Sequence, residues 1–325
     1  MKPPIFIVGC PRSGTSFLYH LLLSAGGFAE FHTQMNVFDV LQPIYGDISQ
    51  TKNKKRMMRD WIGSKAFQVS GLDQQVIEQK VFAECHGASD FLRIVMEEIA
   101  QKQGVDRWID STPTNAPHML RISRDFPDAY FVHIIRDGRD VALSLDKRDW
   151  SRPLPWDKNN GVLAAGLYWE WIVRKTRNYG AKVGSRYTEI RYEDLVMKPE
   201  AALARLGEFI QHDLSYSRIQ QASIGSVKNP LTSFDEDLRE GNFSPVGRWR
   251  VKFSADQLAW FEALVGDYLQ ELGYALAAKA LSNHKGAIRR KRMLYRGFYE
   301  FKQWAKINTP ASRWMVSYPD ILIDK

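Results

Sequence analysis

Cysteine is scarce in this chain of 325 residues, which contains only Cys10 and Cys85. Two cysteines in a chain of this length exclude a framework of disulfide bonds, and a reducing compartment is the simplest setting. The sequence also lacks any apolar run close to the 18 residues that would indicate a transmembrane helix. No charged region followed by an apolar stretch precedes Pro4, so we expect no signal peptide. These absences predict a cytoplasmic protein.

Acidic residues are scarce near the C-terminus, where lysines and arginines outnumber them. The net charge is +8, and residues 283–325 carry +7 of it, with ten lysines and arginines against three acidic residues. Residues 1–282 are therefore almost neutral, so we expect no nucleic-acid partner for them. We divide the chain into a domain at 1–282 and a basic amphipathic extension at 283–325.

The extension has a helical pattern in which Leu294, Phe298, Phe301 and Ala305 share one face. The interpretation that we favour is that this face packs on the domain, or on a second subunit, while the basic face lies in water. The alternative is that the helix contacts an anionic membrane surface or an acidic partner.

A lysine is missing from a loop that otherwise has the form of a phosphate-binding loop. Residues 5–8 are a continuous apolar run, typical of a strand buried on both faces, and residues 15–25 have helical spacing. The loop between them follows the P-loop pattern, except that Thr15 occupies the lysine position. Its N–H groups and the helix N-terminus still favour an anion, whereas ATP hydrolysis is disfavoured. The alternative is a strand–loop–helix connection that binds nothing.

A second candidate anion site follows another apolar run, at residues 130–135. Arg136 comes directly after that run, and Ser144 comes eight residues later in a helical segment. Ligands of open α/β sheets bind at the carboxyl ends of strands, where these two side chains could hold a phosphate. The alternative is a local ion-pair cluster that caps the helix, which suits Asp137, Arg139 and Asp140 better than Arg136.

Apolar strand-like runs alternate with helical patterns along the chain, at residues 5–8, 105–110, 130–135 and 186–191. Such alternation is typical of a parallel sheet that is covered by helices. The sequence therefore predicts an α/β protein with three layers, α/β/α, around a central parallel sheet.

Five segments together resemble a known family. They are PRSGTSFL at 11–18, DSTPTN at 110–115, RDGRDVALSL at 136–145, RYEDLVMKPE at 191–200 and VGRWRVKFS at 246–254. In this order they resemble the sulfotransferases that use 3′-phosphoadenosine 5′-phosphosulfate (PAPS), and most closely the bacterial carbohydrate and tyrosyl-protein type. The resemblance implies the P-loop NTPase-like sulfotransferase fold. It also implies PAPS as co-substrate, no metal, and transfer of a sulfuryl group to an acceptor hydroxyl or amine.

The resemblance also assigns cofactor-binding residues. The 5′-phosphosulfate would be held by the first loop, that is by Arg12, Ser13, Gly14, Thr15 and Ser16. The 3′-phosphate would be held by Arg136 and Ser144. Tyr192 would lie near the adenine, and Arg248 would be the cation of the segment that closes over the nucleotide. Arg250 is the alternative to Arg248, and core packing is the alternative role for Trp249.

Catalysis of this reaction needs a cation at the leaving oxygen and a base for the acceptor. Arg12 is the candidate cation. Relatives carry a glutamate in the region that follows the first helix, which favours Glu30 over His32 as the general base. Glu84 and His86 form another possible source of the base.

The chain departs from the family pattern at Ser111, where many relatives have lysine. Either Arg12 carries the charge alone or another cation substitutes; an inactive relative is the third possibility. Cys10 stands beside the loop, where a small buried residue is expected more than a thiolate nucleophile.

Two other functions remain open from the sequence. One is a P-loop kinase or other phosphotransferase, and the other is a non-catalytic protein that binds nucleotides or polyanions. For a sulfotransferase, the acceptor could be a small molecule, a glycan or a peptide. Residues 30–85 and 150–165 are rich in aromatic and amide side chains, which favours a carbohydrate hydroxyl while a phenol or a peptide tyrosine stays open.

Overall fold

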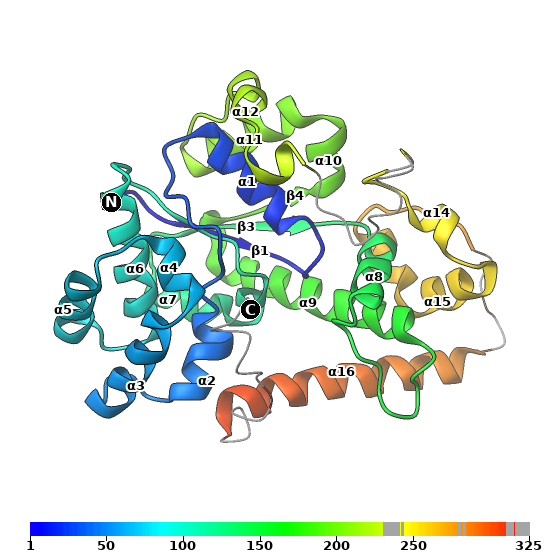
Figure 1. Ribbon diagram of the computed structural model, residues 1–325. Helices are drawn as coiled ribbons and strands as arrows, with labels where there is room; N and C mark the ends of the chain where they lie inside the picture. Colours follow the sequence, from blue (N-terminus) through cyan, green and yellow to red (C-terminus); the bar gives the residue numbers. More distant parts are fainter. Residues whose placement is uncertain (230–240, 242–243, 279–280, 282–283, 310–314, 316–325) are drawn as a thin grey trace.

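A parallel sheet of four strands lies at the centre of the computed structural model, which describes residues 1–229, 241, 244–278, 281, 284–309 and 315 (Figure 1). The strands are β1 (Ile5–Val8), β2 (Ile109–Asp110), β3 (Tyr130–Ile135) and β4 (Tyr187–Arg191). Their order in the sheet is β2-β1-β3-β4, and every pair is parallel. Helices cover both faces, as Figure 1 shows, so the predicted α/β fold with a central parallel sheet is confirmed.

The helices are named as in Figure 1. In the first half of the chain they are α1 (Thr15–Ala25), α2 (Gln42–Tyr45), α3 (Thr51–Ile62), α4 (Lys65–Ser70), α5 (Gln74–Glu84), α6 (Ala88–Lys102), α7 (Met119–Asp125) and α8 (Gly138–Lys147). In the second half they are α9 (Gly161–Val183), α10 (Tyr192–Met197), α11 (Pro199–Ile210), α12 (Tyr216–Ala222), α14 (Trp249–Lys252), α15 (Ala255–Glu271) and α16 (Lys285–Asn308).

Alternate residues of β1 contribute to two separate cores. Ile5 and Ile7 belong to a cluster with apolar residues of α1 and α11, whereas Phe6 and Val8 belong to a cluster with residues of α6 and α9. All four side chains are fully buried. Because side chains of a strand alternate between the faces of a sheet, a continuous apolar run is required for a strand that is covered on both sides.

Strand β2 is shorter than the predicted strand at 105–110. The N–H of Val105 donates to the carbonyl of Ala100 at 3.0 Å, so this residue caps the end of α6 and pairs with no strand. Pairing with β1 begins only at Ile109, which lies beside Ile5. Val105 and Trp108 are thus partly or fully buried without being strand residues.

Helix α16 packs against α9 and α15 through tyrosines. Tyr295 and Tyr299 are buried, and their hydroxyl groups donate to a carboxylate oxygen of Asp157 at 2.7 Å and to the carbonyl of Ala164 at 2.9 Å. Helix α16 thus lies against the domain, but not with the basic face in water that the sequence predicted, because Lys291, Arg292 and Lys306 form ion pairs with Asp157, Glu170 and Asp39. No described helix is both long and apolar enough to cross a membrane.

The buried face of α16 differs from the predicted one. Ala305 is buried and Phe298 is partly buried, but Leu294 and Phe301 are 45% and 62% exposed. The prediction ranked side chains by hydrophobicity alone. The tyrosines take the inner positions because their rings pack while their hydroxyl groups find buried acceptors.

A buried histidine is expected to make the stability of the fold depend on pH. His133 of β3 is fully buried, with Nδ1 2.7 Å from the Tyr187 hydroxyl oxygen. Burial, followed by the charge of Arg177, lowers the pKa of His133 to about 3. The unfolded chain has a histidine pKa of about 6.5, so it binds this proton more readily than the folded chain does. The free energy of unfolding should therefore fall as the pH drops below about 6.5, by up to about 1.4 kcal/mol per pH unit.

Urea denaturation of the wild type and of His133→Gln across this pH range measures that contribution. The difference between the two proteins removes the effects of all other titrating groups. We expect the variant to show a shallower loss of stability on acidification; parallel pH profiles would contradict the assignment.

Candidate functional site

Three strands end at one edge of the sheet, and a candidate site residue follows each of them. β1 leads into the loop at 9–14, β3 leads into Arg136, and β4 leads into Tyr192. Because β2 and β3 lie on opposite sides of β1, the connection reverses direction beside β1. Such a switch point forms the ligand crevice of open α/β sheets.

The loop after β1 runs close beneath the ring of Tyr192. Gly14 has φ 103°, and a Cβ atom at this residue would lie 2.4 Å from the ring of Tyr192, so only glycine fits. Arg12 also has a positive φ of 70°. The N–H of Ser13 donates to the carbonyl of Cys10 at 3.1 Å, while the buried Ser13 hydroxyl has no hydrogen-bond partner within the described chain.

Arg136 connects the loop to a segment from much later in the chain. Its guanidinium donates to the carbonyls of Arg12 (3.2 Å) and Pro245 (2.7 Å) and lies 4.3 Å from the ring centroid of Tyr192. The carboxylate of Asp140 lies 3.9 Å away. The buried Nε atom of Arg136 has no partner among the described residues. The Nε–H group thus has no acceptor among the described residues.

Several positive charges converge around Arg12. Its Nε atom donates to the Ser144 hydroxyl at 3.0 Å, and its guanidinium lies 5.4 Å from the centroid of the Trp150 ring. Burial lowers the pKa of Arg12, and the charges of Arg148 and Arg136 lower it further. Cations held this close repel one another, and a bound anion relieves the repulsion. Arg148 was not predicted, because charged residues at a helix end are usually only solvated.

Asp140 fixes the segment around Gly247 to the start of α8. Its carboxylate accepts hydrogen bonds from the N–H groups of Gly247 (2.8 Å) and Trp249 (2.9 Å). Burial raises the pKa of Asp140, while Arg136 acts in the opposite direction. Trp249 is buried, with the guanidinium of Arg139 3.7 Å from its ring centroid, so it is a packing residue.

The predicted ion-pair cluster exists and lies behind the site. Asp137 accepts a hydrogen bond from the N–H of Arg139 at 2.9 Å, and the two side chains form an ion pair at 2.8 Å. Arg139 also pairs with Glu262 at 2.7 Å. These buried groups satisfy one another, which leaves Arg136 of the neighbouring turn to face the crevice.

Of the two candidate cations in the late segment, Arg248 is the one whose charge acts on Tyr192. Burial raises the pKa of Tyr192, and the positive charge of Arg248 is among the influences that oppose this rise. Arg248 is itself buried and donates to the carbonyl of Ser244 at 3.1 Å. Arg250 is exposed and lies 4.7 Å from the centroid of the Trp249 ring.

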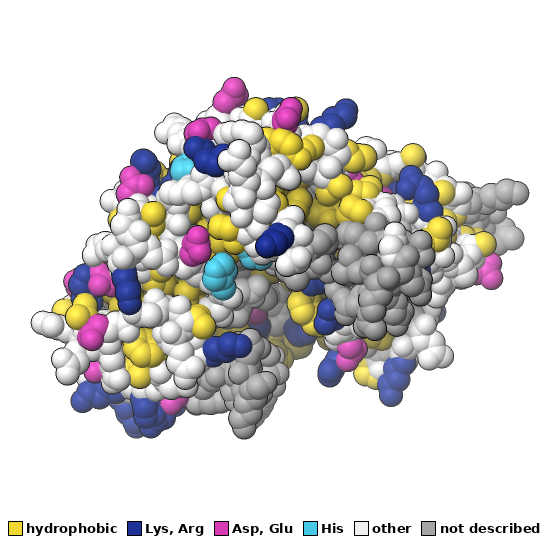
Figure 2. All heavy atoms as spheres, turned by 45° about the horizontal axis from the view of Figure 1, so that its top comes forward, with side chains coloured by type: hydrophobic (Ala, Val, Ile, Leu, Met, Phe, Trp, Pro, Cys, Tyr) yellow, Lys and Arg dark blue, Asp and Glu magenta, His cyan; other side chains and the backbone are white. Residues whose placement is uncertain are grey.

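A cavity of about 290 Å³ brings most of the predicted cofactor-binding residues together. Those on its wall are Arg12, Gly14, Thr15, Ser16, Arg136 and Tyr192. Ser13, Ser144 and Arg248 do not line the cavity, although the Ser144 hydroxyl accepts a hydrogen bond from Arg12 of its wall. Figure 2 shows apolar side chains gathered on this side of the molecule, around α10–α12, and the cavity wall includes Phe17, Leu195, Val196, Tyr216 and Val227. The cavity therefore combines a cationic end with an apolar wall.

Sequence reasoning missed the turn at Gly225–Val227, which forms part of this wall. Ser226 packs against α1, where its N–H donates to Nδ1 of His20 at 3.1 Å. A Cβ atom at Gly225 would lie 2.8 Å from the His20 ring. Burial lowers the pKa of His20, and the neighbouring His32 adds to this effect. No local pattern in the sequence indicates a contact between residues so far apart.

The two candidate bases lie next to each other, outside the wall of the cavity. The Glu30 carboxylate is 3.7 Å from Nε2 of His32, and both side chains are about half exposed (48% and 56%). Gln34 follows shortly afterwards and does line the cavity. Glu84 and His86 are exposed at the end of α5 and do not line it.

Two other predicted features have clear positions. Cys10 is fully buried, and burial raises the pKa of its thiol well above the usual value, so both observations favour a packing role over a thiolate nucleophile. Ser111, at the position of the missing lysine, lies two residues before Pro113 of the cavity wall.

Among the residues that the structure describes, no group of three or more His, Cys, Asp or Glu could hold a metal ion.

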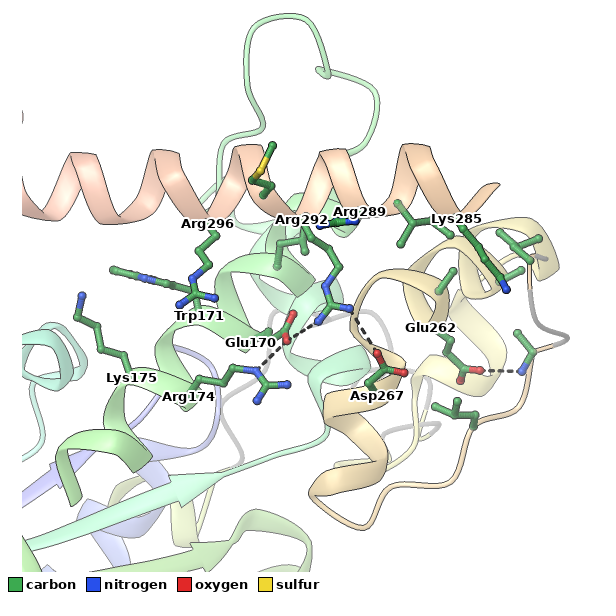
Figure 3. A pocket seen from close by; sticks show the side chains of 18 of the residues that line it. Glu170, Trp171, Arg174, Lys175, Glu262, Asp267, Lys285, Arg289, Arg292 and Arg296 are labelled. Carbon is green, nitrogen blue, oxygen red and sulfur yellow. Dashed lines mark hydrogen bonds and ion pairs between the residues drawn. The ribbon is translucent and has the colours of Figure 1, made fainter. Parts of the chain in front are cut away.

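A larger cavity, of about 1090 Å³, lies between α9, α15 and α16 (Figure 3). Its charges are largely paired with one another. Glu170 accepts hydrogen bonds from Arg174 (2.8 Å) and Arg292 (3.2 Å), and Arg292 also reaches Asp267 (3.4 Å). None of the predicted site residues lines it. We therefore place the candidate site at the smaller cavity, where cations converge and donors lack partners.

Comparison with known proteins shows which family and which named proteins the chain resembles. The family model described as "Sulfotransferase family" matches residues 3–216. Protein-tyrosine sulfotransferase A of Caenorhabditis elegans is 23% identical over 279 residues, which cover 84% of this chain and 67% of that protein. A putative protein-tyrosine sulfotransferase of Caenorhabditis briggsae is 24% identical over 273 residues, which cover 82% of this chain and 84% of that protein.

Two solved structures share the fold. The sulfotransferase domain from the curacin biosynthetic pathway has a TM-score of 0.54 and 17% identity, and covers 85% of this chain and 99% of that chain. The sulfotransferase domain from the Synechococcus PCC 7002 olefin synthase has a TM-score of 0.52 and 16% identity, with 92% and 95% coverage.

The contact between Gly14 and Tyr192 generates a test of the loop geometry. We expect Gly14→Ala to lower the free energy of unfolding more than Gly26→Ala does. Both glycines have positive φ (103° and 79°), but nothing lies within 4 Å of a Cβ atom at Gly26. Gly26→Ala should cost about 1–2 kcal/mol for its backbone conformation, and the clash at Gly14 should add about 1–3 kcal/mol. Equal losses in urea denaturation would show that the ring of Tyr192 does not restrict the loop.

Proposed function

The chain belongs to the sulfotransferase family, and we propose that it transfers a sulfuryl group from PAPS to an acceptor hydroxyl. The convergence of Arg12, Arg136 and Arg148 beside unpartnered buried donors supports this proposal most directly. PAPS carries anionic groups at both its 3′ and 5′ positions, so it suits two adjacent cationic subsites. A kinase is not favoured, because Thr15 stands where such a loop needs its lysine.

In the proposed complex, the subsites follow the three strand ends. The loop from Ser13 to Ser16 holds the 5′-phosphosulfate with its N–H groups and hydroxyls, since these lie at the N-terminus of α1. Arg136 and Ser144 hold the 3′-phosphate. Arg12 already donates to Ser144, so it lies between the two subsites and can interact with either anion.

In the proposed reaction, the acceptor oxygen attacks sulfur while the bond from sulfur to the bridging oxygen breaks. Arg12 and the loop N–H groups stabilise the charge that develops on the leaving oxygen. Arg148 supplies a second cation, which compensates for serine at position 111. Glu30 accepts the proton of the acceptor, and His32, 3.7 Å away, orients its carboxylate. Adenosine 3′,5′-bisphosphate leaves.

The acceptor that we propose to examine first is the phenolic hydroxyl of tyrosine in a peptide. Two relatives with similar sequences are named protein-tyrosine sulfotransferases. Trp150 is 59% exposed beside Arg12 and offers a ring against which an aromatic acceptor can pack. Small phenols and carbohydrate hydroxyls are the acceptors to compare with it.

Calorimetric titration tests the 3′-phosphate subsite. The wild type should bind adenosine 3′,5′-bisphosphate more tightly than ADP, with or without magnesium. Ser144→Ala should lose about tenfold or more in affinity for the bisphosphate and little for ADP, because a hydrogen bond to a charged group contributes about 1.5–3 kcal/mol. Ser123→Ala is a matched control, since that hydroxyl bonds only locally, to the carbonyl of Leu120. Preference for ADP with magnesium would reject the proposal and favour a kinase.

Steady-state kinetics with sulfur-labelled PAPS and a tyrosine peptide test the general base. Glu30→Gln should lower kcat by about 10²–10⁴-fold and leave the affinity for the bisphosphate unchanged, because the amide cannot accept the proton. Glu208→Gln, which changes an exposed glutamate on α11 that was never a candidate base and does not line the cavity, is the control and should keep the wild-type rate. A fully active Glu30→Gln enzyme would exclude Glu30 as the base.

A further inference from the structure

The side of α16 that faces away from the domain carries a row of large apolar side chains. Met293, Leu294, Phe301 and Trp304 are 67%, 45%, 62% and 56% exposed. At 3.6 residues per turn they fall within a sector of roughly 100°, opposite the buried Tyr295. The rings of Phe301 and Trp304 stack on each other, with centroids 6.1 Å apart.

The connection between α8 and α9 adds a tryptophan to this surface. Trp156 is 74% exposed and lines a small cavity together with Leu294 and Arg290 of α16. Figures 1 and 3 both show this connection, in green, extending past α16 and away from the sheet. We call the outer face the surface formed by Trp156, Met293, Leu294, Phe301 and Trp304.

The polarity of α16 is reversed compared with an ordinary surface helix, which buries its apolar stripe and exposes its charges. The inner side of α16 uses tyrosine hydroxyls and ion pairs, and Figure 3 shows Arg292 directed at Glu170 and Asp267. Other inner ion pairs include Lys291–Asp157 (2.7 Å), Glu300–Lys175 (2.7 Å) and Lys306–Asp39 (2.6 Å). A row of exposed apolar side chains of this length indicates an interaction surface.

Positive charges border the outer face. Arg290 lies on the outer face, beside Trp156 and Leu294, whereas Arg289 and Arg296 lie at its flank, where they also line the larger cavity. All three side chains are exposed, and none forms a hydrogen bond or ion pair with another described residue. Eight lysines and arginines against one glutamate give residues 285–308 a charge of +7. A second copy of α16 on this face would bring two such charges together. Residues 309–325 contain two cations and two anions, so they offer no countercharge either.

We propose that the outer face binds the surface of an anionic lipid bilayer. A bilayer supplies both an apolar layer for the aromatic row and negative headgroups for the arginines. Tryptophan is favoured at the boundary between headgroups and acyl chains, where its ring is buried while its N–H stays wet. Helix α16 would lie in the plane of that boundary, with the domain above it.

Vesicle flotation of the full chain tests this proposal. We expect the protein to float with vesicles of phosphatidylcholine and phosphatidylglycerol, to stay behind with phosphatidylcholine alone, and to be released by salt. The double variant Phe301→Ser/Trp304→Ser should bind the anionic vesicles at least tenfold more weakly. A matched control, Val76→Ser/Phe82→Ser, removes two exposed apolar side chains from α5 and should bind as the wild type does.

Several outcomes would overturn the proposal. They are the absence of flotation with anionic vesicles, equal binding by the Phe301/Trp304 double variant, and equal binding by Arg289→Gln/Arg290→Gln/Arg296→Gln. Sedimentation velocity adds a fourth: a wild-type dimer that the Phe301/Trp304 variant converts to a monomer would show that a second copy covers the face. Circular dichroism melting of each variant checks that it is folded, as expected for substitutions of exposed side chains.

Discussion

The ring of Tyr192 is the contact on which the geometry of the site depends. Gly14 passes directly against one part of this ring, and the guanidinium of Arg136 lies 4.3 Å from its centroid. One side chain after β4 therefore positions the loop after β1 and the arginine after β3. The parallel sheet makes this possible because the carboxyl ends of neighbouring strands meet at one edge. The close packing also explains why the loop needs glycine where it passes under the ring.

The site contains several positive charges that repel one another. Arg12, Arg136 and Arg148 lie close enough for the last two to lower the pKa of the first. The surrounding structure supplies the compensation: buried acidic groups neutralise the cations behind the site, as in the pairing of Arg139 with Asp137 and Glu262. Such an arrangement of fixed charges would favour an anionic ligand, as the proposed function requires.

Sequence reasoning succeeded where a residue's position follows from local pattern. The apolar runs at 5–8 and 130–135 are strands, and Arg12 and Arg136 meet because both follow strands of the same sheet. Sequence reasoning failed where a residue's position depends on tertiary contacts. Ser226 reaches His20 across most of the chain, Arg148 looks like a solvated helix end, and α16 buries tyrosines because of acceptors that lie on other elements. The hydrophobicity of the side chains alone could not predict which face of α16 is buried.

The order of the strands also has a consequence for synthesis. The N-terminal strand is central in the sheet, and its neighbours begin at residues 109 and 130, while the segment that packs against Arg136 includes Pro245. A ribosome that adds about 5–20 residues per second needs roughly 6–25 s to extend the chain from β1 to the start of β3. During that interval the first strand lacks one or both of its neighbours in the sheet and has apolar residues on both faces. This chain thus has a long period during translation in which it depends on chaperones or on the nascent helices for protection from aggregation.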